Sequence, residues 1–430
     1  MIKKLLLTTT AVAVFSVSGP AFAGGEMSDL QDQINALQKQ LNVLQSKLEK
    51  QESKGGSISG AKISFHPSPK IESSDGTFSF QPFGRAHLDY AAFSDDKKDH
   101  ADNSNFRRAR VGFKGKVAED FKYKAEFDLA KEEVNFKDVS LTYTGLDAGD
   151  IQVGHFKPVF GLEENTSSNY IQFLERSAPN SAFSRDEEIG LAFKTGGDDW
   201  SFGVGAYGGD AGDTSTADDE FYSLDARASF APVNEKGKVV HVGLGGSYRG
   251  NSDTAKFKAK STGIGTDLVS TGTISGVDNV TVIGAELAAV LDSLSFQSEY
   301  FSADVNRASA TDASFDGWVA QASYLLTGES RPYKGEIGNF SRVKPNSPFS
   351  LKNGGTGAWE ILARFENLDL NDNSSGILGG ELENTTIGVN WYLNNNFRLM
   401  FNYIDVDTDA NSVVASDSPQ IYTARASWDF

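Results

Sequence analysis

Residues 121–129 read Phe121-Lys122-Tyr123-Lys124-Ala125-Glu126-Phe127-Asp128-Leu129, and their polarity changes at every step. One set of alternate side chains is apolar or aromatic, and the other set is charged throughout. A period of two is the pattern of a β-strand, because successive side chains of a strand point to opposite faces. This stretch therefore predicts a strand that separates an apolar environment from an aqueous one.

The same alternation recurs from residue 77 to the end of the chain, in about sixteen segments of roughly ten residues, the length of a tilted strand that crosses a bilayer. The segments lie near 78–92, 106–117, 121–131, 135–144, 148–157, 187–196, 199–208, 220–231, 239–250, 280–291, 293–303, 314–327, 356–369, 382–393, 396–407 and 420–430. Short turns alternate with longer loops, as in outer-membrane barrels. The long connection at 328–355 falls on the side of the short turns and breaks this rule.

We interpret residues 77–430 as an all-β domain, a sixteen-stranded antiparallel transmembrane β-barrel of the bacterial cell outer membrane. The alternative is a soluble all-β protein, such as a tandem sandwich or a propeller, which would also show alternation. Aromatic residues near the segment ends favour the membrane barrel, because such barrels carry aromatic girdles at both interfaces. These residues are Phe78, Tyr90, Phe121, Tyr143, Trp200, Tyr403 and Trp428.

The composition limits the chemistry that the chain can perform. The 430 residues contain no cysteine, which excludes disulfides, thiolate metal sites and a cysteine nucleophile. The formal net charge of −18 argues against a nucleic-acid partner. None of the five histidines lies in an H-E-x-x-H motif, and no G-x-S-x-G nucleophile elbow occurs. We therefore expect no enzyme activity, no cofactor and no metal site.

Three segments precede the barrel. Residues 1–23 combine a basic start, an apolar core and an Ala-Phe-Ala site, which predicts a cleaved signal peptide rather than a membrane anchor. Residues 24–52 are predicted to form a short coiled-coil helix in the periplasm, which a partner copy or the chain's own domain would cover. Its heptad seam consists of Leu30, Ile34, Leu37, Leu41, Leu44 and Leu48. Residues 53–76, rich in Ser, Gly, Pro and Lys, are predicted to be a linker.

Polar side chains of the predicted strands should line the barrel lumen. Basic candidates gather on the first three segments and the last, which are neighbours in a closed barrel; they are Arg85, Arg108, Arg110, Lys114, Lys122, Lys124 and Arg425. They would form one positive wall, which favours anions. Arg227 is a further candidate on a later strand. Acidic residues of the same parity are about as numerous, so ion pairs that pass solutes of either sign are the alternative.

The loop at 158–186 contains many large apolar residues, which a solvated loop rarely carries. We expect it to fold into the barrel and narrow the lumen, with a cap over the mouth or a subunit contact as alternatives. Its basic residues Lys157, Arg176 and Arg185 are candidates to face the solute. The acidic residues Glu163, Glu164 and Glu175 are candidates as well.

Several motifs resemble the phosphate-selective porin O/P family. Gly84-Arg85-Ala86-His87-Leu88-Asp89-Tyr90 resembles its first strand, and the stretch from Phe106-Arg107-Arg108-Ala109-Arg110 to Phe127-Asp128-Leu129 resembles the next two. Lys157-Pro158-Val159-Phe160-Gly161-Leu162-Glu163, followed by Phe173-Leu174-Glu175-Arg176, is similar to its constriction loop. The segment from Leu326 to Tyr333 resembles a later family segment.

The resemblance implies a homotrimer of sixteen-stranded barrels whose basic side chains carry small inorganic anions such as phosphate. The carriers that it implies are Arg85, Arg107, Arg108, Lys124, Lys157 and Arg176. Members selective for phosphate have a dense arginine ladder, whereas here only scattered arginines such as Arg227 and Arg249 extend the wall.

We therefore predict an outer-membrane porin, surrounded by lipid and lipopolysaccharide, that prefers anions and has phosphate or polyphosphate as candidate solutes. The alternatives are a general or sugar-permeable porin, and a structural protein that tethers the envelope through a barrel anchor.

Overall fold

The computed structural model describes residues 39, 61–65, 68–94, 96–130, 132–209, 211–212, 221–250 and 252–430. The predicted signal peptide lies outside these residues, as does the predicted coiled coil apart from Lys39. Within these residues, no helix has the length and apolar character needed to cross a membrane.

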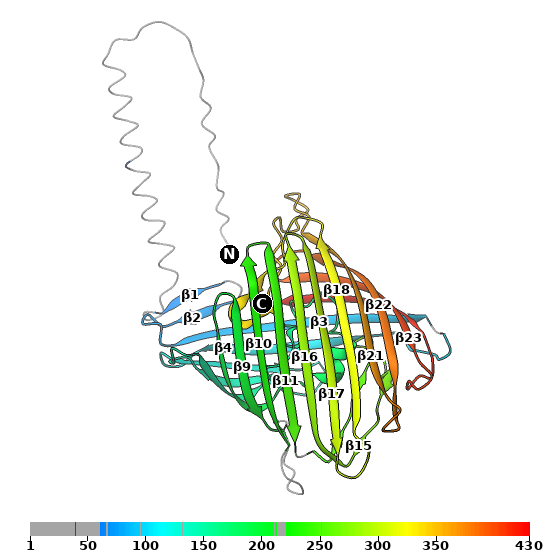
Figure 1. Cartoon of the computed structure of the whole chain (residues 1–430). Coiled ribbons are helices and arrows are strands. Elements are labelled where there is room, and N and C mark those ends of the chain that lie inside the picture. Colours follow the sequence, from blue (N-terminus) through cyan, green and yellow to red (C-terminus); the bar gives the residue numbers. More distant parts are fainter. Residues whose placement is uncertain are drawn as a thin grey trace, which may run out of the picture. The chain divides into compact units, whose positions relative to one another are not determined.

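Sixteen antiparallel strands form a closed barrel, as predicted (Figure 1). Each strand pairs with the next, and the last closes onto the first, with Arg85 opposite Asp429 and Ser94 opposite Gln420. The strands, in order around the barrel, are β3 (Ser79–Ser94), β4 (Asn103–Lys116), β5 (Phe121–Asp128), β6 (Asn135–Tyr143), β7 (Asp150–Phe156), β8 (Glu188–Gly196), β9 (Trp200–Tyr207), β10 (Tyr222–Glu235), β11 (Lys238–Gly250), β16 (Val277–Leu291), β17 (Leu294–Arg307), β18 (Ala313–Leu325), β21 (Ala358–Asp372), β22 (Ile377–Tyr392), β23 (Phe397–Thr408) and β24 (Gln420–Asp429).

A short hairpin extends the sheet at the start of β3. It consists of β1 (Lys62–Ser64) and β2 (Lys70–Glu72), and Ile71 of β2 pairs with Phe80 of β3. Both strands lie in the segment predicted as a linker. Part of that segment therefore contains ordered structure that the Ser-rich composition does not indicate.

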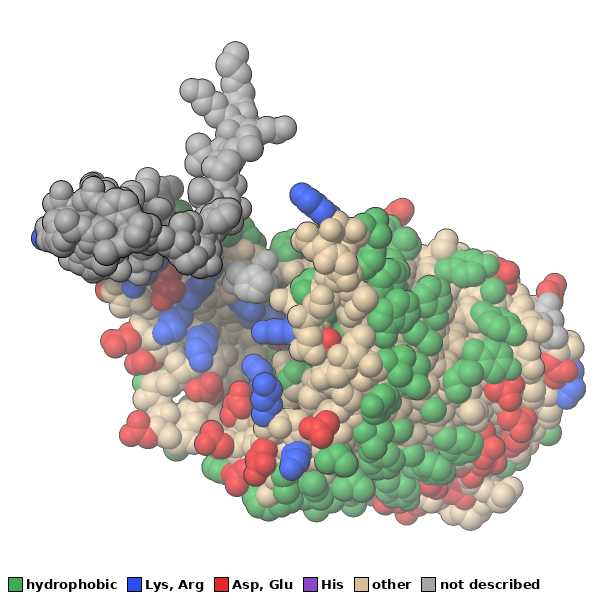
Figure 2. Space-filling view, turned by 90° about the horizontal axis from the view of Figure 1, so that it is seen from above, with side chains coloured by type: hydrophobic (Ala, Val, Ile, Leu, Met, Phe, Trp, Pro, Cys, Tyr) green, Lys and Arg blue, Asp and Glu red, His purple; other side chains and the backbone are tan. Residues whose placement is uncertain are grey.

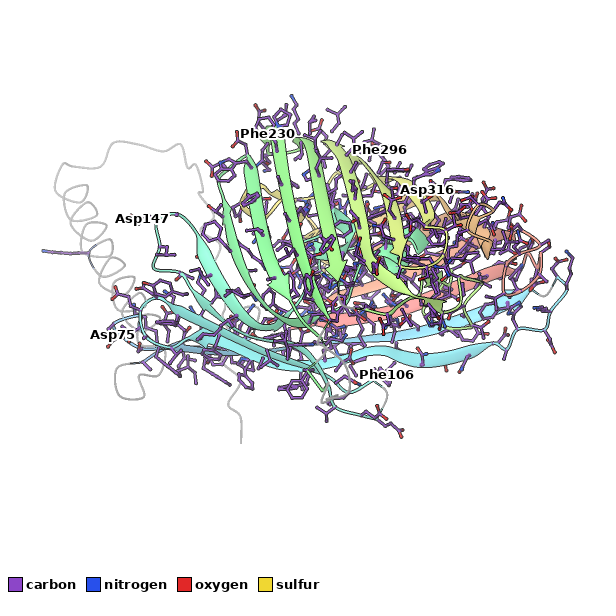
Figure 3. All side chains as sticks on the ribbon, turned by 60° about the horizontal axis from the view of Figure 1, so that its bottom comes forward. Asp75, Phe106, Asp147, Phe230, Phe296 and Asp316 are labelled. Atoms are coloured by element: carbon purple, nitrogen blue, oxygen red, sulfur yellow. The ribbon has the colours of Figure 1, made fainter. Side chains whose placement is uncertain are left out.

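The two faces of the strands differ in polarity as the alternation predicts. In β9, Trp200, Phe202 and Val204 are exposed on the outside, and the residues between them face inward. Phe230 and Phe296 likewise lie on the outer side of their strands (Figure 3). Hydrophobic side chains cover much of the outer face (Figure 2). Such a face is stable in hydrocarbon, which is the environment of an outer-membrane barrel.

Three connections fold into the barrel. The constriction loop (157–187) carries α2 (Leu162–Asn165) and α3 (Ala178–Phe183). The second loop (251–276) carries β12 (Thr254–Ala255), β13 (Lys258–Ala259), β14 (Val269–Ser270) and β15 (Ile274–Ser275). The periplasmic connection (326–357), on the side of the short turns, carries β19 (Tyr333–Lys334), η1 (Gly335–Ile337) and β20 (Asn339–Phe340). The sequence predicted the inward folding of only the first.

The constriction loop crosses the lumen and bonds to strands far around the barrel. The amide of Leu162 donates to Glu299 of β17 (2.8 Å), and the amide of Leu174 donates to Asn402 of β23 (3.1 Å). The inward glycines of two strands leave room for it. A Cβ at Gly245 of β11 or Gly284 of β16 would lie 3.1 or 3.2 Å from the ring of Phe160.

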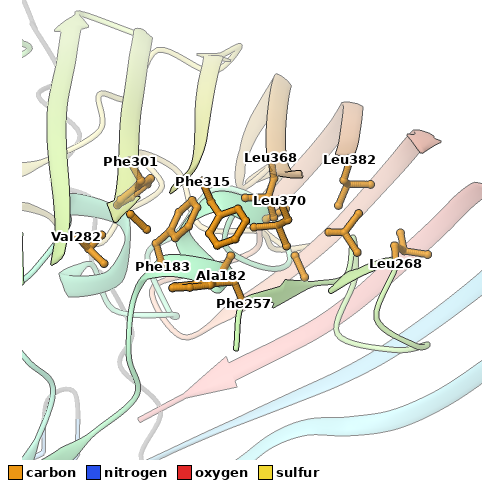
Figure 4. Packing of buried hydrophobic residues seen from close by; sticks show 14 of the residues in the cluster. Ala182, Phe183, Phe257, Leu268, Val282, Phe301, Phe315, Leu368, Leu370 and Leu382 are labelled. Carbon is orange, nitrogen blue, oxygen red and sulfur yellow. The ribbon is translucent and has the colours of Figure 1, made fainter. Parts of the chain in front are cut away.

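Apolar side chains of the constriction loop and the second loop fill one half of the lumen. Phe183 of α3 and Phe257 of the second loop pack together with Phe315 of β18 and with leucines of β21 and β22 (Figure 4). The inward face is therefore not polar throughout. It is apolar where the strands meet these two loops, because dry packing replaces water there.

Candidate functional site

A water-accessible cavity of about 1340 Å³, which we refer to as the channel, lies in the other half of the lumen. Its lining comes from strands β3 to β10, from connections between them and from the three inserted connections, and includes no residue of β11, of β16 to β18 or of β21 to β24. The channel is thus displaced toward the side that the loops leave open. Lys and Arg side chains gather about a hollow on the face seen in Figure 2.

Among the residues that the structure describes, basic side chains outnumber acidic ones in this lining, thirteen to nine. The basic residues are Arg85, Arg107, Arg108, Arg110, Lys124, Lys137, Lys157, Arg176, Arg185, Lys194, Arg227, Lys258 and Lys260. The acidic residues are Glu126, Asp128, Asp138, Glu164, Glu175, Asp186, Glu187, Asp267 and Glu336.

Several acidic residues on the inward face of the strands hold the constriction loop instead of facing water. Glu299 accepts from the amides of Leu162 and Glu163, at 2.8 and 2.9 Å. Glu360 accepts from the side chain of Gln172 (2.9 Å), and both carboxylates are fully buried. The near balance of charge in the sequence therefore does not extend to the channel, because buried backbone and side-chain donors take up these carboxylates.

A β-bulge in β4 brings two consecutive arginines to the channel. His87 of β3 pairs with Arg108 and Leu88 pairs with Phe106, so that Arg107 is left as the extra residue. Neighbouring residues of a regular strand point to opposite faces, and a bulge relaxes this alternation. Phe106 consequently remains outside the barrel, and both arginines reach Glu175 of the constriction loop.

Three guanidinium groups surround the Glu175 carboxylate, and we refer to them as the arginine cluster: Arg107, Arg108 and Arg425. Arg108 donates from both Nη atoms, at 2.8 and 3.0 Å, and Arg107 donates from Nη2 at 3.1 Å. Arg425 of β24 approaches the same carboxylate to 2.5 Å and also bonds to Asp89 through two donors at 2.6 Å. The structure thus brings together predicted residues from both ends of the barrel sequence.

The other predicted residues of β3 to β5 lie beside this cluster. Arg85 bonds to Ser168 of the constriction loop (2.8 Å) and to Glu126 (2.9 Å). Arg110 pairs with Asp128 at 2.8 Å, and Lys124 lies 3.2 Å from both Glu126 and Asp138.

Lys114 and Lys122 do not contribute to the lining of the channel. The Lys114 ammonium lies 5.4 Å from the centre of the Phe83 ring. Lys122 is exposed near the start of β5, next to the turn that joins β4 and β5, where it lies opposite Lys116 in the register.

Lys157, Arg176 and Arg227 touch the channel but also hold inserted segments in place. Lys157 forms an ion pair with Glu164 of its own loop. Arg176 donates to three backbone carbonyls of the loop, at 2.9 to 3.1 Å. Arg227 bonds to both oxygens of Glu286 and to the carbonyl of Gly338 in the periplasmic connection (2.8 Å).

Four basic lining residues were not among the sequence candidates: Lys137, Lys194, Lys258 and Lys260. A signal existed for the last two, because Lys256-Phe257-Lys258-Ala259-Lys260 alternates within a loop. Phe257 and Ala259 are buried in the apolar cluster, and the lysines that alternate with them are exposed. The alternation of lysines with apolar residues in this loop is therefore typical of an extended segment that packs against the barrel on one side and faces water on the other.

Comparison with known proteins agrees with this architecture. The family model described as phosphate-selective porin O and P matches residues 80–430. The chain belongs to the phosphate-selective porin O and P family. Its members are channels of the outer membrane and not enzymes, as the motifs of the first three strands and the constriction loop indicated.

Two further comparisons place this member of the porin O and P family among its relatives. Porin O of Pseudomonas aeruginosa is 31% identical over 384 residues, which cover 79% of this chain and 85% of that protein. Among solved structures, a loop-deletion mutant of the Vibrio cholerae outer membrane protein OmpT has a TM-score of 0.55 at 12% identity, over 82% of this chain and all of that one. An anion-selective porin from Comamonas acidovorans has a TM-score of 0.52 at 13% identity, with the same coverage. These two structures share the fold.

Proposed function

We propose that the protein is a passive outer-membrane channel that prefers small inorganic anions, phosphate among them. The observation that carries the proposal is the excess of basic side chains along the open half of the lumen, thirteen against nine among the described lining residues. Charged walls in a narrow water-filled space favour ions of the opposite sign, since they replace part of the lost hydration.

The way in which the charges are paired supports an anion preference over a neutral channel. Lys194 bonds to the amide oxygen of Gln152 (2.8 Å) and Lys260 is exposed, and neither has a carboxylate within ion-pair distance among the described residues. Ion pairs neutralise each other's field, whereas these two ammonium groups keep theirs. Membership of the porin O and P family and the name of the anion-selective Comamonas porin agree with this preference.

The assembly that we propose is a homotrimer embedded in outer-membrane lipid, with lipopolysaccharide around its outer half. A solved form of OmpT, which shares the fold, is a trimer. The segment 24–52 would add a coiled coil on the periplasmic side, preceded by the signal peptide 1–23. Its heptad seam requires a partner, and copies of the same chain supply one.

Reversal potentials test the preference directly. The purified mature protein is placed in a planar bilayer under a KCl gradient, and the sign of the potential at zero current shows which ion passes more readily. We expect chloride to pass more readily, and expect the double variant Lys258→Gln/Lys260→Gln to move the potential toward zero. Lys352→Gln is the matched control, because Lys352 is exposed and lies outside the channel lining.

A potassium preference or a potential of zero in the native protein would overturn the proposal. The second result would favour a general porin that passes sugars and ions of either sign. An absence of conductance would favour a tethering protein with a closed barrel.

A further inference from the structure

The arginine cluster has the form of a binding site for an oxyanion, with a side chain of the protein inside it. Oε1 of Glu175 accepts from Arg108 (2.8 Å) and Arg425 (2.5 Å), and Oε2 accepts from Arg107 (3.1 Å) and Arg108 (3.0 Å). Planar guanidinium groups that donate in pairs are the usual partners of carboxylates and phosphates. The wall supplies the arginines, and the inserted loop supplies the anion.

The balance of positive and negative charge in the arginine cluster depends on the Glu175 carboxylate. Arg425 is shared with Asp89, so that three cations face two carboxylates. Without the charge of Glu175, three guanidinium groups would face Asp89 alone. The Nε atoms of Arg107 and Arg108 are also buried without a hydrogen-bond acceptor, so the cluster has donors to spare among the described residues.

The cluster is open to the channel. The side chains of Arg107 and Glu175 are 35% and 15% exposed, and both line the channel wall. A solute that passes the constriction therefore meets the same donors that Glu175 occupies. A site that holds an ion strongly slows its passage, because conduction requires that each ion leave as readily as it enters.

We propose that Glu175 is a tethered counter-anion, which fills the arginine cluster and prevents it from retaining a permeating oxyanion such as phosphate. Glu175 is thus a specificity-determining residue that keeps the constriction weakly binding. This inference rests on the proposed anion permeation and assigns the control of anion affinity to one loop side chain.

Phosphate block of single-channel current tests the inference in the full mature protein. We expect inorganic phosphate to reduce the KCl current of Glu175→Gln at a concentration about tenfold or more below that needed for the native channel, since a charge-assisted hydrogen bond to phosphate is worth about that factor. Glu163→Gln is the matched control. Glu163 is a buried carboxylate of the same loop that pairs with Arg364 (2.8 Å) and does not line the channel. Its block should equal that of the native channel.

Two additional variants separate anion capture from loop displacement. Arg107→Gln combined with Glu175→Gln removes the most exposed guanidinium and should restore weak block. Glu175→Asp keeps the charge but withdraws it by one methylene, and should show block between the native channel and Glu175→Gln.

The outcomes are distinct. If phosphate blocked Glu175→Gln and Glu175→Asp only at the concentration that blocks the native channel, the inference would be overturned. A severalfold rise in KCl conductance without phosphate block would overturn it too, because the carboxylate would then serve only to hold the loop. The native reversal potential is measured separately, so a failure of the proposed anion preference is recognised independently of these variants.

Discussion

The basic side chains that line the barrel fall into two groups, which differ in the exposed fraction of the side chain. The Arg425 side chain is fully buried between Asp89 and Glu175, whereas the Arg107 side chain is 35% exposed beside the same carboxylate. The first holds the loop against the wall, and the second faces the solute. Both have the same charge, so only their surroundings distinguish their effects.

Arg425→Ala should destabilise the barrel by about 3–5 kcal/mol, because it leaves two buried carboxylates without their common partner. Arg107→Gln should change stability by less than about 1 kcal/mol, since Glu175 keeps Arg108 and Arg425. Reversible urea unfolding in lipid vesicles measures both. Equal losses in the two variants would contradict the division into buried and solute-facing arginines.

Strand alternation was sufficient to predict Arg85, Arg108 and Arg110 as lumen residues, because it depends only on local geometry. It could not predict from strand parity that Arg107 joins them, since the bulge in β4 depends on pairing with β3. Nor could it show that Glu299 and Glu360 are withdrawn from water. The partner of a lumen carboxylate depends on which distant loop folds against it, and alternation contains no information on that.

At the scale of elements, the constriction loop depends on the glycines of the strands behind it. Gly284→Leu should force the Phe160 ring away from β16, because even a Cβ there would lie 3.2 Å from it. We expect a larger and noisier single-channel conductance. Gly246→Leu on neighbouring β11 is the control, because its Cβ would have no atom within 4 Å. Equal conductance in both variants and in the native channel would refute this role of Gly284.

The buried carboxylate of Asp417 joins two extracellular loops, and contacts from Lys97, Lys98 and Ser418 surround it. Asp417 accepts from the amides of Lys97 (2.7 Å) and Lys98 (3.2 Å) and from His100 (2.6 Å). Burial raises the pKa of Asp417, but His100 and these amides outweigh it and hold the pKa below 3.8. A lowered pKa stabilises the contact above pH 3.8, and this contribution is lost only as the pH falls through the lowered value.

Asp417→Asn should therefore loosen these loops at neutral pH. Trypsin should cleave after Lys97 or Lys98 faster in the variant than in the native protein at pH 8. Asp407→Asn is the control, because Asp407 bonds to Ser418 and not to the first loop. Relative to an unstructured lysine peptide, which corrects for the fall in trypsin activity at acid pH, native loops should resist cleavage to the same extent from pH 8 down to about pH 5, well above the lowered pKa. A steep change within that range would contradict the assignment to Asp417.

At the scale of the whole molecule, the barrel and the segment before it are separable in function. Among the described residues, those that line the channel lie between Arg85 and Asn339. Deleting residues 24–60 should therefore leave conductance and reversal potential unchanged. If residues 24–52 form the proposed coiled coil, oligomers of the deletion variant should dissociate at a lower temperature on unheated SDS gels. Leu41→Lys should have the same effect, and a changed reversal potential in either variant would refute the separation.

The number and order of the strands could be predicted because each strand has its own polarity pattern and its own turn. The asymmetric filling of the lumen could not, although the long connection at 328–355 was a visible exception among the short turns. Its folding into the barrel depends on contacts such as that of Arg227 with the Gly338 carbonyl, which join residues more than a hundred positions apart. The second loop is a similar case, because its apolar residues match a wall that is apolar only where the loop covers it.

The displacement of the channel has an evolutionary consequence. Most of the apolar wall that packs against the inserted loops, on β16 to β18 and β21 to β24, and the wall that meets the solute, on β3 to β10, occupy different arcs of one barrel. Mutations on the solute-facing arc can thus retune which nutrients a cell admits, while the scaffold that sets the width of the passage is inherited intact.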